Sequence, residues 1–539
     1  FAAEKMATTA WIQGLMEYPE AELAEATRSL LTNQFHDILG GTSIPSGERT
    51  AMEELGHGLT LTSRVKARAF FALTSGQRPG KPGTHPILVF NPHPFPVRAV
   101  VECEVQPAWP DREDQFGNPV VSGPRGPLPA QAEKEESNIN EDHRKRVVFT
   151  ATLKAGRMNR FHCRFEKVPR MPAPAQQAKG GRFRFKTSEL DVVVNARTGL
   201  LDRFRIFGKD YLAQAAACPL VMKDNADPWG MTVSSFREPA GKFKLMTRTE
   251  AARFAGVEGR QLSPVRIIED GPVRTVLETL FGYGTSGICL RYKLPRKGTE
   301  VEMEVRVLWQ ERDSMLKLAF PTPWKRGSLT AQVAYGAQEM AASGNEMVSQ
   351  KWHAVTSRRA ARTLSVINDS TYGCDFMNGE LRLSLLRAPA HAGHPTGRGP
   401  ILRQDRFTPR LDQGEHLFRF WLNGGPEKDR LAALDREALA HNEEPFALSY
   451  WPSGKGRLPS PGPSLSDKAV QLTAFKRAEG GGDAIVRLFE PTGRGRRTTL
   501  TLEPFGMKHP VTMGPFEIKT LRIDPGTGRV SEVNLLGES

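Results

Sequence analysis

The feature that most constrains the fold is a change in hydrophobic periodicity near residue 77. Residues 3–18 and 20–39 are rich in helix formers, and the second of these segments carries apolar residues at mostly helical spacing. A third segment has one apolar stripe with steps of three, four or six residues, made of Met52, Leu55, Leu59, Val65, Ala69 and Leu73. Three helices with one apolar face each can bury these faces against one another. The sequence therefore predicts a three-helix bundle over residues 1–77.

From residue 78 onward the pattern is that of short β-strands. Residues 78–86 form a linker rich in proline and glycine, and alternation of apolar and polar residues follows, most clearly over residues 301–309. The 539-residue chain contains 50 glycines and 40 prolines, an excess of turn formers that favours many short strands over long helices. We therefore expect a mainly β chain with an N-terminal α-helical part, a three-helix bundle followed by several β-sandwich domains.

A chain of this length is expected to hold several domains. Its composition predicts a small β domain at 85–170, a large β-sandwich at 180–452 and a terminal β domain at 467–525, with a proline-, glycine- and serine-rich boundary at 452–466. Residues 109–142 are polar, charged and rich in proline, which predicts a long inserted loop.

The net charge of +14 raises the question of an anionic partner such as nucleic acid. The densest basic blocks, at residues 143–146 and 494–497, are short, far apart in the sequence and free of interleaved aromatic residues. No nucleic-acid recognition motif accompanies them, so we expect no nucleic-acid partner.

The cysteine pattern and the hydropathy bear on the compartment. Five scattered cysteines without a CxxC pair indicate a reducing environment, and we expect a cytoplasmic location. No segment approaches the roughly 18 apolar residues of a membrane span, and acidic residues near the N-terminus argue against a signal peptide. We therefore expect no membrane association. Because the sequence begins with Phe1 rather than methionine, we expect a segment of a longer protein, although processing would look the same.

The strongest candidate for chemistry is the pair His36-Asp37, which lies where the second predicted helix ends on Gly40 and Gly41. An imidazole can bind a divalent metal, and the carboxylate can bind the same metal or accept hydrogen bonds from sugar hydroxyls. Glycine supplies the left-handed residue of a helix C-cap, so both side chains can address one pocket there. Two donors fall short of a four-ligand site, so a capping or surface pair stays the alternative.

Two other clusters are weaker candidates. His391 and His394 lie in a loop rich in proline and glycine and are more typical of solvated side chains. Residues 224–229 contain two aspartates and an asparagine but lack the ligand pattern of a known calcium loop, so we interpret them as a turn that can line a substrate site. The chain has no phosphate-binding loop, no HExxH and no GxSxG motif.

A family resemblance begins at the same histidine. The run Asn33-Gln34-Phe35-His36-Asp37-Ile38-Leu39, followed by Thr42-Ser43-Ile44, closely resembles the signature of the α-mannosidases of glycoside hydrolase family 38. Weaker similarities follow in the family's order at residues 89–92, 316–321, 368–373, 381–387, 414–418, 474–479 and 516–521. The resemblance covers nearly the whole chain and indicates the cytosolic and bacterial branch.

The resemblance implies a domain order of α/β barrel, three-helix bundle and β-sandwich domains, with this chain starting just before the bundle. By the same resemblance His36 is one of four residues that hold a zinc ion, with cobalt as an alternative metal, and Asp37 contacts mannose hydroxyls. Arg387 matches an arginine directed toward the active site, and Asp369 and Tyr372 are further substrate-binding candidates. The other three metal ligands, the nucleophile and the general acid would lie on the barrel, so no catalytic residue is expected in this chain.

One position departs from the family pattern, because Gly40 stands where the family usually has proline. Proline would fix the backbone that leaves the helix, whereas glycine leaves it freer. The departure therefore bears on how firmly His36 and Asp37 are positioned.

The implied function is retaining, metal-dependent hydrolysis of terminal α-mannose from glycans or oligosaccharides. The expected partners are these α-mannosides and an N-terminal catalytic barrel, in cis or in trans, and a homo-oligomer stays open. We expect the isolated chain to be inactive, because the barrel would carry the nucleophile and the acid. The alternatives are a non-catalytic carbohydrate-binding β-sandwich protein and a scaffold subunit of a split enzyme, which the gene immediately upstream would distinguish.

Overall fold

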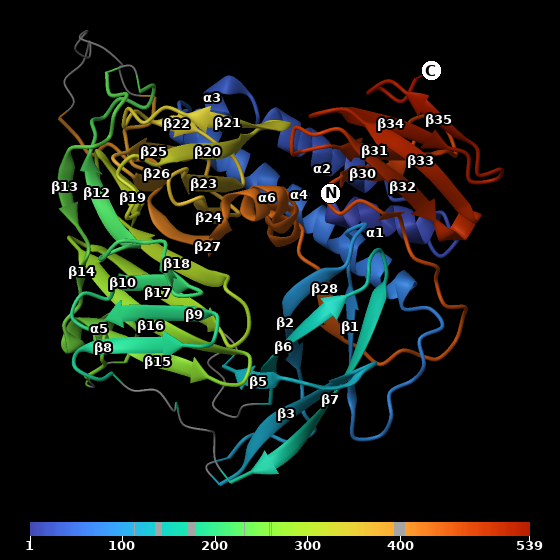
Figure 1. Cartoon of the computed structure of the whole chain (residues 1–539), viewed down its shortest axis with the longest axis horizontal. Coiled ribbons are helices and arrows are strands. Elements are labelled where there is room, and N and C mark those ends of the chain that lie inside the picture. The colour runs from blue at the N-terminus through green and yellow to red at the C-terminus, as the bar shows by residue number, and fades with distance from the viewer. Residues whose placement is uncertain are drawn as a thin grey trace.

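The computed structural model describes residues 1–112, 114–134, 143–169, 174, 178–230, 232–257, 259, 261–392 and 405–538. It confirms a mainly β chain with helices at its N-terminus. A large, a small and a terminal β unit lie around the N-terminal helices (Figure 1). Across these described residues, no helix combines the length and the apolar character that a membrane span requires.

The N-terminal part consists of the helices α1 (Ala2–Trp11), α2 (Glu20–Thr32), α3 (His36–Leu39) and α4 (Pro45–Leu73). Helix α4 begins with proline, which is tolerated there because the first N–H groups of a helix have no intrahelical partner. Helix α1 packs on the C-terminal half of α4 and on strand β1 (His85–Phe90). Their shared core includes Met6, Ala7, Ala10, Val65, Ala69, Phe70, Leu73, Leu88 and Phe90.

The predicted three-helix bundle is only half closed. The predicted helix over residues 20–39 is interrupted, so that α3 is a separate single turn. Along the predicted stripe of α4, Val65 and Leu73 are buried, whereas Met52 and Leu59 are 66% and 69% exposed. Helix α2 buries none of its residues. Periodicity decides which face of a helix is apolar, but burial needs a partner, and the described residues do not cover this half of α4.

The small β unit packs two sheets against each other. One sheet has the order β28 (Phe446–Ser449), β1, β7 (Met158–Val168), β3 (Phe116–Gly123) and β4 (Gly126–Leu128). The other has the order β2 (Val97–Val105), β6 (Lys145–Leu153) and β5 (Ala130–Glu133). The core between them includes Ile87, Val89, Val101, Val121, Val147, Phe149 and Phe161. Strand β28 belongs to this unit although the sequence placed residues up to 452 in the large sandwich.

The prediction of a long loop over residues 109–142 is wrong where the structure describes it, because β3, β4 and β5 lie there. Strand β3 pairs with β7, which follows more than thirty residues later, and buries Phe116 and Val121 in spite of its polar neighbours. Such long-range pairing cannot be read from local composition. Residues 113 and 135–142 of this segment lie outside the described residues.

The large β unit has three sheets. A four-stranded sheet has the order β11 (Lys209–Asp210), β10 (Leu201–Ile206), β9 (Leu190–Asn195) and β8 (Arg182–Lys186). A six-stranded sheet has the order β13 (Pro239–Lys242), β12 (Cys218–Lys223), β19 (Ser314–Pro321), β26 (Glu380–Arg387), β25 (Gly373–Met377) and β22 (Met347–Val348). The ten-stranded sheet contains β14 (Lys244–Leu245), β15 (Val265–Asp270), β16 (Arg274–Tyr283), β17 (Ser286–Pro295), β18 (Val301–Trp309), β27 (Gly414–Pro426), β24 (Arg362–Asn368), β23 (Trp352–Ser357), β20 (Ser328–Val333) and β21 (Gly336–Met340).

The sheets of the large unit enclose one continuous apolar core. Strand β18 buries every second residue from Val301 to Trp309, as its alternation predicts. In β26 a register shift opposite residues 316 and 317 brings Leu386 into the core in place of Leu385. Two helices belong to this unit, α5 (Arg248–Phe254) and α6 (Glu427–Asn442), and α6 packs on the ten-stranded sheet.

The terminal β unit also has two sheets around its own core. They contain β29 (Ser464–Leu465), β32 (Arg496–Leu502) and β33 (Met507–Met513), and β30 (Gln471–Arg477), β31 (Ala484–Phe489), β34 (Ile518–Ile523) and β35 (Val530–Val533). A short 3-10 turn, η1 (Glu503–Phe505), joins β32 to β33. Trp11 and Ile12, at the end of α1, pack against this core, which ties the unit to the helices.

The small and large β units are joined by a buried ion pair. The guanidinium of Arg274 on β16 donates to both carboxylate oxygens of Glu133 on β5, at 2.7 and 2.6 Å. Oε1 of Gln131 accepts from the backbone N–H groups of Val273 and Arg274, both at 3.0 Å. Glu102 on β2 adds a second carboxylate 2.7 Å from Arg274. Charged and polar side chains of the small unit thus pair with Arg274 of the large unit and hold the two units together.

Glu269 on β15 makes the junction pH-sensitive. Burial raises the pKa of Glu269 to about 7, although the backbone N–H of Lys134 donates to its carboxylate at 2.9 Å. The folded protein therefore holds this proton more tightly than the unfolded chain, and its stability falls as pH rises from about 4.5 to about 7. Glu269→Gln removes this loss, so its free energy of unfolding relative to the parent should rise by about 2–3 kcal/mol between pH 4.5 and pH 8.

Thermal and urea unfolding at the two pH values would measure this difference. Glu479→Gln is the matched control, because that side chain is 88% exposed. An equal pH dependence of the two variants would contradict the assignment to Glu269.

Candidate functional site

His36 and Asp37 lie on the single turn α3, outside the core. Gly41 has φ of +69°, and its N–H donates to the carbonyl of Ile38 at 3.0 Å, so this turn ends on glycine as the sequence indicated. Gly40 itself is right-handed, with φ of −75°. The side chains of His36 and Asp37 are 76% and 45% exposed, and Nε2 of the imidazole lies 3.5 Å from Oδ1 of the carboxylate.

Several exposed apolar side chains flank this pair along the sequence. We call this set the helical apolar surface, and it consists of Leu30, Leu31, Phe35, Leu39, Ile44, Met52 and Leu59. Each of these side chains is between 47% and 73% exposed. Large contiguous apolar surfaces mark interaction sites in proteins that stay dispersed in water. The pair therefore sits within a surface that is suited to contact another domain.

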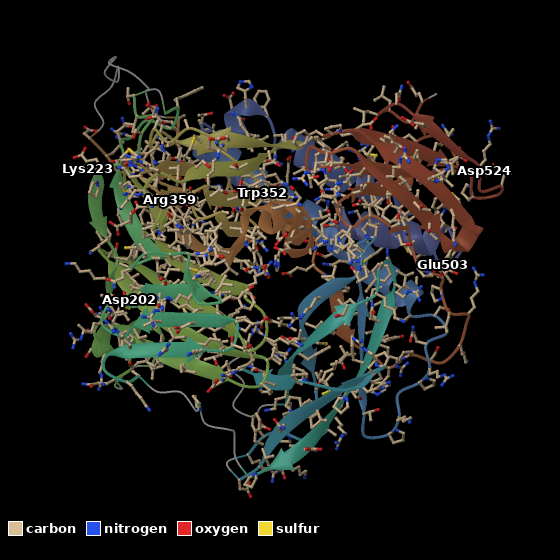
Figure 2. The ribbon with its side chains drawn as sticks, viewed as in Figure 1. Asp202, Lys223, Trp352, Arg359, Glu503 and Asp524 are labelled. Atoms are coloured by element: carbon tan, nitrogen blue, oxygen red, sulfur yellow. The ribbon has the colours of Figure 1, made fainter. Side chains whose placement is uncertain are left out.

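Arg387, at the end of β26, is fully engaged by its neighbours. Its Nε and Nη2 donate to the carboxylate of Asp224 at 2.7 and 3.1 Å, and its Nη2 and Nη1 donate to the backbone carbonyls of Asp227 and Pro228 at 2.7 and 3.2 Å. The ring of Phe236 lies 5.0 Å from the guanidinium carbon. Arg387 thus holds the segment that follows β12. Figure 2 labels Lys223, the last residue of that strand. The carboxylate of Asp224 serves the guanidinium, and no contact suggests a calcium site.

A chain of contacts connects Arg387 with α3. The backbone N–H of Arg387 donates to the carboxylate of Asp412 at 3.1 Å. The neighbouring Leu411 approaches the end of α3 so closely that a Cβ atom at Gly41 would lie 3.6 Å from its Cδ1. Nearby, Nε2 of His391 lies 2.5 Å from Oε2 of Glu48 in the first turn of α4, so this histidine is a structural partner. His394 lies outside the described residues.

The other two predicted substrate residues have different surroundings. Asp369 accepts from Nε of Arg419 at 2.8 Å and from its backbone N–H at 3.3 Å, and it faces a cavity between β units. The side chain of Tyr372 is 62% exposed, while its backbone carbonyl accepts from the N–H of Ser349 at 2.9 Å. The structure thus brings Arg387 toward α3 and places Asp369 in a separate cavity.

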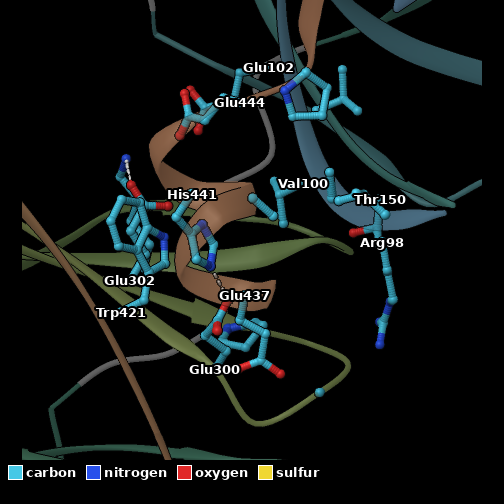
Figure 3. Close-up of a pocket in the computed structure, with 18 of the residues that line it drawn as sticks. Arg98, Val100, Glu102, Thr150, Glu300, Glu302, Trp421, Glu437, His441 and Glu444 are labelled. Carbon is cyan, nitrogen blue, oxygen red and sulfur yellow. Dashed lines mark hydrogen bonds and ion pairs between the residues drawn. The ribbon is translucent and has the colours of Figure 1, made fainter. Parts of the chain in front are cut away.

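That cavity, of about 1100 Å³, lies between the small β unit, the ten-stranded sheet and α6. Figure 3 shows His441 projecting from α6 between Trp421 and Glu300. The imidazole stacks on the indole with centroids 4.1 Å apart and lies 2.9 Å from Oε1 of Glu300. Burial by itself lowers the pKa of His441, but Glu300 and its neighbouring carboxylates raise it above its usual value. The guanidinium carbon of Arg419 also lies over the Trp421 ring, 5.3 Å from its centroid.

The cavity is a weaker candidate site than the His36-Asp37 pair on α3, because eight of the charged groups that line it pair with one another. These pairs are Lys293 with Glu302, Arg274 with Glu102, Arg419 with Glu444 and His441 with Glu300. The Trp421 ring, which is in contact with both His441 and Arg419, is already engaged within the protein. We interpret the cavity as part of the junction between the units.

Comparison with known proteins decides the family. The model of the glycosyl hydrolases family 38 C-terminal domain matches residues 188–396, that of the alpha mannosidase middle domain matches residues 1–73, and that of the family 38 C-terminal beta sandwich domain matches residues 469–521. Together the three matches cover more than half of the chain. The chain belongs to glycosyl hydrolase family 38.

Relatives of this family 38 chain are named as α-mannosidases. "Alpha-mannosidase G" of Dictyostelium discoideum is 22% identical over 299 residues, which are 48% of this chain and 26% of that protein. "Alpha-mannosidase 2C1" of Homo sapiens is 23% identical over 509 residues, which are 88% of this chain and 41% of that protein. A crystal structure of an alpha-mannosidase from Enterococcus faecalis V583 has a TM-score of 0.72 at 15% identity, covering 97% of this chain and 65% of that chain, which shows a shared fold.

The family 38 chain thus spans about a quarter and about two fifths of the lengths of these two relatives. Its own donors fit a metal ion only in part. Two donors at about 2.1 Å from a tetrahedral zinc ion lie roughly 3.4 Å apart, close to the 3.5 Å between Nε2 of His36 and Oδ1 of Asp37. Yet the described residues contain no group of three or more His, Cys, Asp or Glu side chains placed to hold a metal. A complete site would need donors beyond them.

Sequence reasoning missed the residues that contact Arg387 and the end of α3. Asp224 and Asp412 lie far from Arg387 in the sequence, and Leu411 lies far from Gly41. The aspartates of residues 224–229 were visible as a cluster, but their role as acceptors for Arg387 follows only from the pairing of β12, β19 and β26. A single sequence carries no signal for such a contact.

Proposed function

We propose that this chain forms the part of a retaining, metal-dependent α-mannosidase that completes a catalytic barrel and hydrolyses terminal α-mannose from glycans or oligosaccharides. The observation that carries the proposal is the exposed His36-Asp37 pair within the helical apolar surface. One metal donor beside a carboxylate that can contact sugar hydroxyls, both exposed among apolar side chains, fits a site that a second domain completes. Family 38 membership supports the same chemistry.

In this proposal each residue of the chain has a limited role. His36 supplies one neutral imidazole nitrogen to a zinc or cobalt ion, and the metal, when bound, polarises and orients the vicinal hydroxyls of mannose. Asp37 accepts hydrogen bonds from sugar hydroxyls, or shares the metal. The exposed Tyr372 is a further substrate contact. Asp369, which pairs with Arg419, is a substrate contact at the junction cavity.

The bond-breaking groups would come from the barrel. In a retaining mechanism a carboxylate attacks the anomeric carbon and a carboxylic acid about 5–5.5 Å away protonates the leaving oxygen. A covalent glycosyl intermediate is then hydrolysed by water. This chain would position the sugar and exclude water from one side of the pocket.

The test compares the purified chain with the chain assembled with the barrel encoded beside it, in cis or in trans. With an aryl α-mannoside and added zinc, the chain alone should show no turnover and the assembled protein should be active. Zinc-dependent turnover by the chain alone, lost in His36→Ala and absent from a mock preparation, would contradict the proposal. Binding of α-mannosides without any activity of the assembled protein would favour a carbohydrate-binding module instead. A cytoplasmic location, the absence of a nucleic-acid partner and the oligomeric state stay predictions.

A further inference from the structure

The four-stranded sheet of the large β unit lies in a segment with a concentrated positive charge. Residues 179–210, which contain the four strands, hold eight basic and four acidic side chains, a net charge of +4 in 32 residues. The whole chain of 539 residues carries +14, so an even distribution would place less than +1 in this segment. Charge that gathers on one face of a domain attracts partners of the opposite charge.

Strand alternation separates an apolar side of this sheet from a basic side. Phe185 and Phe204 point into the core of the large unit. The side chains that point the other way include Arg182, Arg184, Lys186, Asp191, Val193, Asn195, Arg203 and Arg205. Val193 lies opposite both Arg184 and Arg203 in the strand register and is only 5% exposed. Long basic side chains cover apolar neighbours with their stems, so their charged ends form the surface of this face.

Part of the positive charge is neutralised within the sheet. Nε and Nη2 of Arg184 donate to the two carboxylate oxygens of Asp191, both at 2.9 Å, and Nη1 of Arg203 lies 3.5 Å from the same carboxylate. Arg205 makes the same two-pronged contact with Asp210, at 2.6 and 2.9 Å. Guanidinium groups on this face are thus already placed so that they recognise oxyanions.

Three more cations follow the line of β8 and have no ion-pair partner among the residues that the structure describes. Arg182 and Lys186 lie on the strand itself, and Lys179 lies opposite Arg182 in a β-bridge just before it. All three residues are exposed. Outward positions of a strand recur about every 6.8 Å, so Arg182, Arg184 and Lys186 line roughly 14 Å of the sheet. We call Lys179, Arg182, Arg184 and Lys186 the basic row.

The basic row is not accompanied by an apolar or aromatic contact surface. Among the outward positions that the structure describes, the one aliphatic side chain, Val193, is covered, and the exposed Phe207 lies in the turn between β10 and β11. Single-stranded nucleic acids stack on aromatic side chains, and protein interfaces have an apolar core. Stable membrane binding needs a second, apolar anchor besides a basic patch. A hydrophilic polymer with regularly spaced anionic groups needs neither feature.

We propose that the basic row binds an acidic polysaccharide through its sulfate or carboxylate groups. Arginine binds such oxyanions with two parallel hydrogen bonds, and lysine adds a point charge. Figure 1 shows β8 well away from α3, which carries His36 and Asp37. The inference therefore goes beyond the proposed function, and its failure would leave that proposal standing.

Heparin, a sulfated polysaccharide, is the probe for this site. Fluorescence anisotropy of labelled heparin with the full chain should show binding that weakens steeply between about 50 and about 200 mM salt. Combining Lys179→Gln, Arg182→Gln and Lys186→Gln should lower the affinity at least about tenfold, because three cations of the row are lost. The thermal unfolding midpoint should stay the same, since the three residues are exposed.

The matched control combines Arg494→Gln, Arg497→Gln and Lys508→Gln on the terminal β unit. These three residues are exposed as well, and both triple variants carry the same net charge. The control should keep the heparin affinity of the parent chain. An equal loss in the two variants would overturn the proposal, because it would assign the binding to net charge alone. No measurable binding at low salt would overturn it as well.

Two further probes distinguish the polysaccharide from other anionic partners. They are vesicles that contain phosphatidylserine and a single-stranded oligonucleotide. Both should bind more weakly than heparin, because the basic row offers them no apolar anchor and no stacking surface. If either probe binds as tightly as heparin and loses its affinity in the variant of the basic row, the assignment to an acidic polysaccharide is wrong.

Discussion

Replacing His36 by alanine in the assembled enzyme should lower kcat/KM for an aryl α-mannoside by at least about 100-fold and release the bound metal. The imidazole is 76% exposed and has no role in the core, so the folded chain should lose no stability. The effect would arise because a four-ligand site that keeps three protein ligands holds its metal more weakly. Turnover as a function of added zinc, together with the metal content of the purified protein, would measure it.

His57→Ala is the matched control for this experiment. His57 also lies on the surface of the helices, 53% exposed, with its Nε2 atom 2.7 Å from Oε1 of Glu25. It should leave both activity and metal content unchanged. If His36→Ala and His57→Ala behave alike, His36 is a surface residue, and the metal site lies elsewhere.

Arg274→Ala should destabilise the chain by about 3–5 kcal/mol, because it leaves the buried carboxylate of Glu133 without its cation. Arg274 is 3% exposed and Glu133 is 6% exposed, so water cannot take over the lost hydrogen bonds. The partly buried Glu102 shares the same guanidinium at 2.7 Å and loses its partner too. Urea unfolding followed by tryptophan fluorescence would measure the change.

Two further variants separate charge from packing at this junction. Arg306→Ala on β18 removes an exposed pair with Glu415 on β27 and should change the free energy of unfolding by less than about 1 kcal/mol. Arg274→Met combined with Glu133→Gln should recover much of the loss, since burying apolar groups in place of a charge pair is often neutral. A loss for Arg274→Ala no larger than that for Arg306→Ala would show that the ion pair does not hold the two units together.

The helices illustrate how far the sequence reaches. The stripe of α4 predicted the burial of Val65, Ala69 and Leu73, and the structure confirms it. The same stripe predicted the burial of Met52 and Leu59, which are exposed. Apolar spacing is a property of one helix, whereas burial is a property of two surfaces. The helical apolar surface became visible only when the structure showed which half of the stripe lacks a partner.

The candidate site divides in the same way. The motif around His36 pointed to a metal and a sugar before any fold was known, because an imidazole beside a carboxylate carries its chemistry in the residue types. The ion pair of Asp369 with Arg419 and the clamp of Arg387 on Asp224 did not follow from the sequence. The first contact joins residues 50 positions apart and the second joins residues 163 positions apart. The pairing of strands decides such contacts.

The sequence by itself determined the class of chain, mainly β after a helical start, and it predicted a metal-and-sugar role for His36 and Asp37. Both are local, since periodicity and residue type act over a few positions. Only the tertiary structure decided that this pair lies exposed, and that Arg387 binds the carboxylate of Asp224. The physical reason is that exposure and long-range ion pairs depend on which elements pack against one another. No local sequence pattern encodes that packing.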